Sequence, residues 1–171
     1  MARDPIAKLM EDHQVFLRTV QTFQRDIDPN VSKVVGDSLL PRRIADFGHF
    51  LLHDVDSIHG QQEERGLFPA LEQYIPLEGG PIEILMDEHE ALRDYQLTLD
   101  RGGRKLESDP SAEEVRRAVT TIARSVEELL ETHVMKEDTV LFPMAYQVLS
   151  ARELERISLV FDEVESTAGP G

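Results

Sequence analysis

Two short stretches of the sequence repeat the same pair of potential metal ligands, a histidine followed four residues later by a glutamate. The pairs are His59 with Glu63 and His133 with Glu137. Residues four apart on a helix have neighbouring side chains, roughly 5–6 Å apart at Cβ, so each pair points the same way. Both pairs lie on stripes of apolar residues, where a carboxylate is costly unless it is paired or bound to a metal. The pattern therefore indicates metal binding.

A lone histidine precedes each pair in a similar context. His13 follows Met-Glu-Asp and His89 follows Met-Asp-Glu, so the chain resembles two copies of a helical hairpin. Either histidine alone is more simply a hydrogen-bonded core residue, but the complete repeated set favours a metal cluster. Imidazole and carboxylate without thiolate suit iron, manganese or zinc. The expected ligands are His13, His59, Glu63, His89, His133 and Glu137.

Other polar residues near these positions are not expected to bind metal. His53 points roughly 120° away from His59 around the helix, at about 100° per residue. We therefore expect His53 and His49 at the surface or behind the ligands. Glu64 and Asp138 directly follow the ligand glutamates and are expected to point off the cluster.

The two pairs also share a Leu-Phe-Pro ending, at residues 67–69 and 141–143. Proline has no backbone N–H and disfavours helix at the residue before it. The ending therefore predicts that each metal-binding helix kinks or stops there. We expect the leucine and phenylalanine of each ending to cover the site and exclude bulk water.

Apolar residues recur at helical spacing along most of the chain, and no segment shows sustained strand-like alternation. The expected helices cover residues 4–26, 41–65, 81–101, 112–141 and 150–165. Loops are expected at Asp28-Pro29-Asn30 with Gly36 and at the later glycine- and proline-rich stretches. The fold class is therefore all-α, a four-helix bundle with a short additional C-terminal helix. We expect a single domain over residues 1–165 and a frayed tail over residues 166–171.

Composition excludes several classes of function for this 171-residue chain. Lys and Arg number 18 against 33 Asp and Glu, a net charge of −15, which argues against nucleic-acid and anionic-membrane surfaces. The absence of cysteine excludes disulfides, iron–sulfur clusters and thiolate zinc sites. The sequence contains no run of about 18 apolar residues, so it predicts no membrane span. The N-terminal residues lack an apolar signal core, so we expect a cytoplasmic protein.

With both Leu-Phe-Pro endings, the six candidate ligands resemble the hemerythrin-like family, named for its His-His-Glu ligands, over roughly residues 5 to 165. The resemblance implies an up-down four-helix bundle that encloses two iron ions. It also implies that the four histidines are terminal ligands and that Glu63 and Glu137 bridge the metals. An oxo or hydroxo group normally completes the bridge.

One position departs from the family's pattern. Oxygen-carrying members have a second histidine one turn after the third-helix histidine, and Arg93 stands there. A guanidinium stays protonated and cannot be a ligand, although it could stabilise an anionic oxygen species. About four of the roughly 12 positions on two six-coordinate irons would stay open. Small molecules could fill them, or an extra ligand such as Tyr74, Tyr95 or Tyr146.

Three functions are compatible with this pattern of residues. Our first hypothesis is catalase-like disproportionation of hydrogen peroxide, because two adjacent irons with open positions can exchange two electrons with peroxide. The second is a module for O₂, nitric oxide or iron sensing or storage without turnover, which would need a partner protein for its output. The third is a structural bundle with zinc or no metal, against which the two buried carboxylates argue.

Overall fold

The computed structural model describes residues 4–27 and 39–169. All regular elements in these ranges are helices, which confirms the all-α class. The predicted loop with Asp28-Pro29-Asn30 and Gly36 lies outside the described residues, as do residues 170–171 of the predicted tail. None of the helices in the described ranges is long and apolar enough to cross a membrane.

The first repeat forms two long helical stretches. Asp4 caps helix α1 (Pro5–Ile27), because its Oδ1 accepts hydrogen bonds from the backbone N–H groups of Ile6 at 3.0 Å and Ala7 at 3.3 Å. The second stretch is continuous but changes its winding several times. It consists of α3 (Leu40–Phe50), the π-helical segments η2 (Leu51–Gly60) and η3 (Glu63–Leu67), and α4 (Phe68–Leu71).

The second repeat has the same plan. It consists of α5 (Pro81–Ser108), α6 (Glu113–Lys136), the π-helical segment η4 (Glu137–Leu141) and α7 (Phe142–Val148). Helix α8 (Ala151–Ala168) follows and opens on a capping box between Ser150 and Glu153, which the sequence pattern indicates. It ends at Ala168 rather than at residue 165, so the first residues of the predicted tail are helical.

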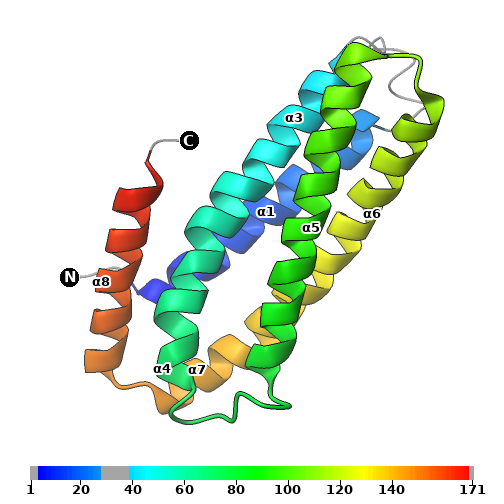
Figure 1. Ribbon diagram of the computed structural model, residues 1–171. Coiled ribbons are helices and arrows are strands. Elements are labelled where there is room, and N and C mark those ends of the chain that lie inside the picture. Colours follow the sequence, from blue (N-terminus) through cyan, green and yellow to red (C-terminus); the bar gives the residue numbers. More distant parts are fainter. Residues whose placement is uncertain (1–3, 28–38, 170–171) are drawn as a thin grey trace.

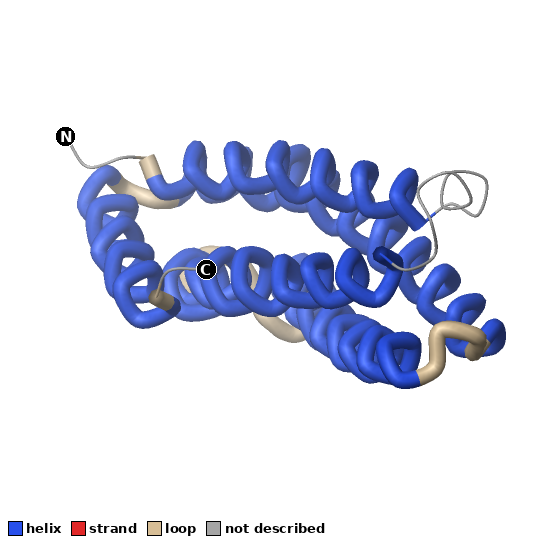
Figure 2. Tube along the Cα trace, turned by 90° about the horizontal axis from the view of Figure 1, so that it is seen from above, coloured by secondary structure: helices blue, strands red, loops and turns tan. Residues whose placement is uncertain are grey.

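The long helices lie alongside one another as a helical bundle (Figure 1). Helix α5 packs against α6 and α3, and α1 packs against α6. Helix α8 lies outside, against η2, η3 and α1. A Cβ on Gly66 would lie 3.0 Å from the ring of Phe161 of α8, so a larger residue there would require this ring to shift. Seen from above, short loops join helices that make up nearly all of the described chain (Figure 2).

The helices do not stop at the Leu-Phe-Pro endings, which corrects the predicted stop there. In an α-helix, Pro69 would clash with the carbonyl four residues before it and leave that carbonyl unbonded. Here the preceding turn is π-helical, and the N–H of Phe68 donates to the carbonyl of Glu63, five residues back. Phe142 donates to Glu137 in the same way. Each wider turn accommodates its proline, and the helix continues.

The apolar core falls into two clusters with a polar layer between them. One cluster includes Phe16, Val55 and Leu130, and the other includes Leu9, Leu67 and Leu141. In each long helical stretch, the predicted ligand stands between a residue of the first cluster and one of the second. The folding of four apolar stripes thus carries the polar residues to one level of the bundle.

Candidate metal centre

The structure brings all six predicted ligands together in the layer between the two apolar clusters. His13 comes from α1, His59 from η2, His89 from α5 and His133 from α6, while Glu63 and Glu137 begin the segments η3 and η4. All six side chains are buried, and both glutamates are completely inaccessible to solvent. Such π-helical turns often occur at functional sites, and here η3 and η4 each start at a buried carboxylate.

The six residues form two sets of four that share both glutamates. One set is His13, His59, Glu63 and Glu137, and the other is His89, His133, Glu63 and Glu137. Within each set, one nitrogen or oxygen atom of every residue lies within 4.8 Å of the others. Two adjacent positions therefore exist, each surrounded by two imidazoles and two carboxylates.

Each glutamate presents one oxygen to each set. Glu63 Oε1 lies 3.4 Å from His59 Nε2, and its Oε2 lies 3.4 Å from His89 Nε2. Glu137 Oε2 lies 3.1 Å from His13 Nε2, and its Oε1 lies 3.3 Å from His133 Nε2. A carboxylate placed in this way can hold one ion with each oxygen.

The outer nitrogen of every histidine in the sets faces a second carboxylate. Asp138 lies 2.8 Å from His13 Nδ1, and Glu64 lies 2.8 Å from His89 Nδ1. In the equivalent contacts of the other two histidines, Glu88 lies 2.9 Å from His133 Nδ1 and Asp12 lies 3.5 Å from His59 Nδ1. Metal-binding histidines commonly donate their other N–H to such a carboxylate, which leaves the inner nitrogen as a lone-pair donor to the ion.

These outer carboxylates refine the sequence-based expectation. Glu64 and Asp138 are absent from both four-residue sets, as expected, but each of them binds a histidine of the sets from behind. Asp12 and Glu88 are two further carboxylates of this kind, which the pattern of histidine–glutamate pairs did not identify. Their positions directly before His13 and His89 in both repeats are the one sequence signal that could have found them.

The inner carboxylate oxygens fit a metal because they have no hydrogen-bond partner within the described chain. The Nε2 atoms of His13 and His59 contact each other at 3.1 Å, and a histidine that donates Nδ1–H outward would turn the lone pair of Nε2 toward a bound ion. None of the four oxygens of Glu63 and Glu137 has a hydrogen-bond donor among the residues that the structure describes. Burial of unpaired carboxylates is costly, and only a proton or a cation between the facing lone pairs removes the cost. Imidazole and carboxylate ligands suit iron, manganese or zinc.

The same arrangement perturbs the pKa values of the metal-free site. Burial alone would lower the pKa of His13, but Asp138 and Glu137 raise it to about 10. Burial likewise opposes a charged His89, yet Glu63 and Glu64 raise its pKa to about 10. Burial and the negative charge of Glu63 raise the pKa of Glu137. Protons therefore occupy the site strongly in the absence of metal.

Aromatic rings enclose the histidines. Phe142 stacks on His13 with ring centroids 5.5 Å apart, and Phe68 stacks on His89 at 5.9 Å. Both phenylalanines belong to the Leu-Phe-Pro endings, so these endings do cover the layer. Phe16 meets His59 edge-on at 4.9 Å.

The two remaining histidines and two of the tyrosines lie away from the two sets. Exposed His49 stacks on half-buried His53, which contacts the Gly169 carbonyl at 3.3 Å. The hydroxyls of Tyr74 and Tyr146 donate to Glu153 and Asp4 on the surface.

Tyr95 and Arg93 both belong to α5 but lie in different surroundings. Tyr95 packs against the apolar cluster around Phe16. Arg93 reaches the outer side of the centre, where its Nη2 donates to Glu64 at 2.6 Å.

A comparison with protein-family models agrees with this geometry. No curated protein sequence matched the chain. The family model of the hemerythrin HHE cation-binding domain matches residues 4–145, which include all six residues of the two sets. Helix α8 lies beyond the matched residues. Because the match covers most of the chain and contains the complete buried His/Glu layer, the protein belongs to the hemerythrin HHE cation-binding family.

Proposed function

We propose that this protein binds two iron ions and uses them to disproportionate hydrogen peroxide. The observation that carries the proposal is the pair of four-residue sets that share Glu63 and Glu137. One ion would be held by His13 and His59, the other by His89 and His133, and both glutamates would bridge them. An oxo or hydroxo bridge between the ions belongs to the same proposal, as does the up-down order of the four long helices within a single domain.

The ligand set leaves room for reaction. Four histidines and two bridging carboxylates fill about eight of roughly 12 positions on two six-coordinate ions. Bound iron would supply two-electron exchange with peroxide. In the overall reaction, one peroxide loses two electrons and two protons and leaves as O₂. A second peroxide accepts them, its O–O bond breaks, and two water molecules leave.

The chain's own residues would orient the centre and keep it dry. Asp12, Glu64, Glu88 and Asp138 hold the outer N–H of the four histidines, which fixes each ring and its tautomer. The stacked rings of Phe68 and Phe142 restrict bulk water. Glu63 and Glu137 would balance the charge of the ions and could hold a proton when an ion is lost.

Oxygen evolution tests the catalytic part of the proposal. Iron-loaded protein is mixed with hydrogen peroxide, and the O₂ formed per iron is followed with an oxygen electrode. We expect sustained evolution well above that of the same concentration of free iron. The matched control is His53→Ala, which should retain wild-type metal content and rate because His53 contacts Gly169 rather than the layer. A rate no better than free iron would rule out catalase-like turnover.

A second function is favoured by the enclosure of the site between two apolar clusters. In that case the centre binds O₂ or nitric oxide, or stores iron, without turnover. Reversible oxygenation of the diferrous protein would support this alternative, whereas rapid irreversible autoxidation would count against it.

A further inference from the structure

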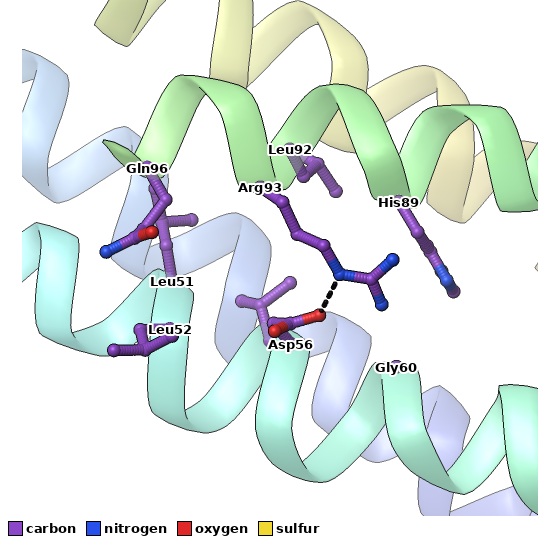
Figure 3. A pocket seen from close by; sticks show the side chains of 9 residues that line it. Leu51, Leu52, Asp56, Gly60, His89, Leu92, Arg93 and Gln96 are labelled. Carbon is purple, nitrogen blue, oxygen red and sulfur yellow. Dashed lines mark hydrogen bonds and ion pairs between the residues drawn. The ribbon is translucent and has the colours of Figure 1, made fainter. Parts of the chain in front are cut away.

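A small cavity reaches the centre from one side. It lies between η2 and α5, and its walls include the apolar side chains of Leu51, Val55 and Leu92. His89 stands at one side of this cavity (Figure 3). The cavity volume of about 20 Å³ is enough for one water-sized molecule. The space therefore suits a small ligand and no larger substrate.

Of the six residues in the two sets, only His89 lines the cavity. His89 lines it and is 6% exposed, whereas His13 of the other set has no exposed surface and stacks on Phe142. Gly60 also lines the cavity, and a Cβ there would lie 3.8 Å from His89 Nδ1. A residue without a side chain thus keeps the wall open beside His89.

Arg93 brings a positive charge into this space. Its Nε donates to Asp56 at 2.7 Å (Figure 3). Its Nη2 donates to Glu64 at 2.6 Å. Glu64 in turn binds His89 Nδ1. A guanidinium carries five N–H donors and stays protonated, and its Nη1 has no hydrogen-bond partner among the described residues. Donors therefore remain for a ligand in the cavity.

We propose that this cavity is the access route and binding site of a small ligand that carries or develops negative charge, at the ion held by His89 and His133. Arg93 is a positioning residue that stabilises that charge, and hydrogen peroxide is the ligand of this class that the proposed function uses. The inference rests on the proposed function, because it requires metal in the centre.

Azide is a suitable probe because it is a small anion whose binding to ferric iron changes the visible absorption. Arg93→Met keeps an unbranched side chain but removes the charge and the donors. We expect its iron-loaded form to bind azide about tenfold more weakly, as for the loss of one hydrogen bond to a charged group. Arg93→Lys retains the charge and should recover most of the affinity.

A second pair of variants tests the route itself. Leu52 lines the cavity and is 46% exposed, whereas Leu97 does not line it and is 49% exposed. Leu52→Trp should slow azide association several-fold in stopped-flow measurements, and the matched control Leu97→Trp should leave it unchanged. Circular dichroism of each variant confirms that the helices are retained.

The outcomes separate the two proposals. Iron content is measured first, and a wild-type protein that takes up no iron would overturn the proposed function and the route together. Two irons per chain with equal azide affinity and association rate in wild type, Arg93→Met and Leu52→Trp would overturn the route alone. Weaker binding in Arg93→Met, recovery in Arg93→Lys and slower association only in Leu52→Trp would support it.

Discussion

The two halves of the candidate centre arise from the same repeated motif, yet different elements lie outside them. Behind His59, Asp12 accepts a hydrogen bond from Lys8, which also contacts Gln62 and Glu165 of α8. Behind His89, Glu64 is bound by Arg93, and the cavity opens there. The repeat thus brings together the same candidate ligands in both halves, whereas residues outside the repeat place the cavity beside only one of them.

The largest effect is expected from removal of a shared glutamate, because it removes a ligand from both halves at once. Glu63→Ala or Glu137→Ala should abolish the two-metal site. Iron per chain after purification measures this, with His53→Ala as the control that keeps its metal. Retention of two irons by Glu137→Ala would show that the halves do not share this carboxylate.

Metal affinity should also depend steeply on pH, through one histidine in each half. The pKa values of His13 and His89 in the metal-free protein are raised to about 10, so both carry protons at neutral pH. Each ion must displace the proton of its own half, and apparent affinity therefore rises with pH until about pH 10 and falls as pH decreases. This corresponds to about tenfold per pH unit for each ion and about a hundredfold for the two ions together.

Competition with a chelator at several pH values between 6 and 9 measures this dependence. An affinity that does not change over this range would contradict protonation of the metal-free histidines. His13→Gln and His89→Gln would each remove the proton of one half, so either variant should show a shallower slope as well as weaker binding.

The outer carboxylates should have smaller effects that differ between the halves. Asp138→Asn and Glu64→Gln each weaken the orientation of one histidine, and we expect a loss of metal affinity of about 10–100-fold for one ion. Only Glu64→Gln should also alter azide binding, because Glu64 contacts Arg93 as well as His89. Titration with iron, followed by azide, distinguishes them. Identical azide affinities in the two variants would argue that the halves are equally accessible.

The smallest effect is expected from the lysines behind Asp12 and Glu88. Lys8 is 16% exposed and has three partners, whereas Lys136 is 37% exposed and contacts Glu88. Lys8→Met should lower the free energy of unfolding by about 1 kcal/mol, and Lys136→Met by less. Urea unfolding of the metal-free proteins measures both. A greater loss of unfolding free energy for Lys136→Met would contradict the larger contribution expected from the three contacts of Lys8.

The convergence of the six candidate ligands could be predicted because the pattern occurs in both repeats and helical spacing fixes which side chains share a face. Contacts between helices could not, since adjacency of Asp12 to His13 does not indicate that Asp12 binds His59. Helical spacing also failed where the winding changes. Leu52 lies seven residues before His59 and Val140 seven residues after His133, so an α-helix would place each on the ligand face, yet they are 46% and 48% exposed. Both lie in π-helical segments, whose wider turns shift side chains from positions expected for an α-helix.

The central claim is that the two four-residue sets each hold one iron ion. Iron content per chain, measured by elemental analysis on protein purified without added metal, tests it most directly. We expect about two irons per chain. No iron, or a single zinc, would contradict it and favour a structural bundle that keeps the family's residues without its metals.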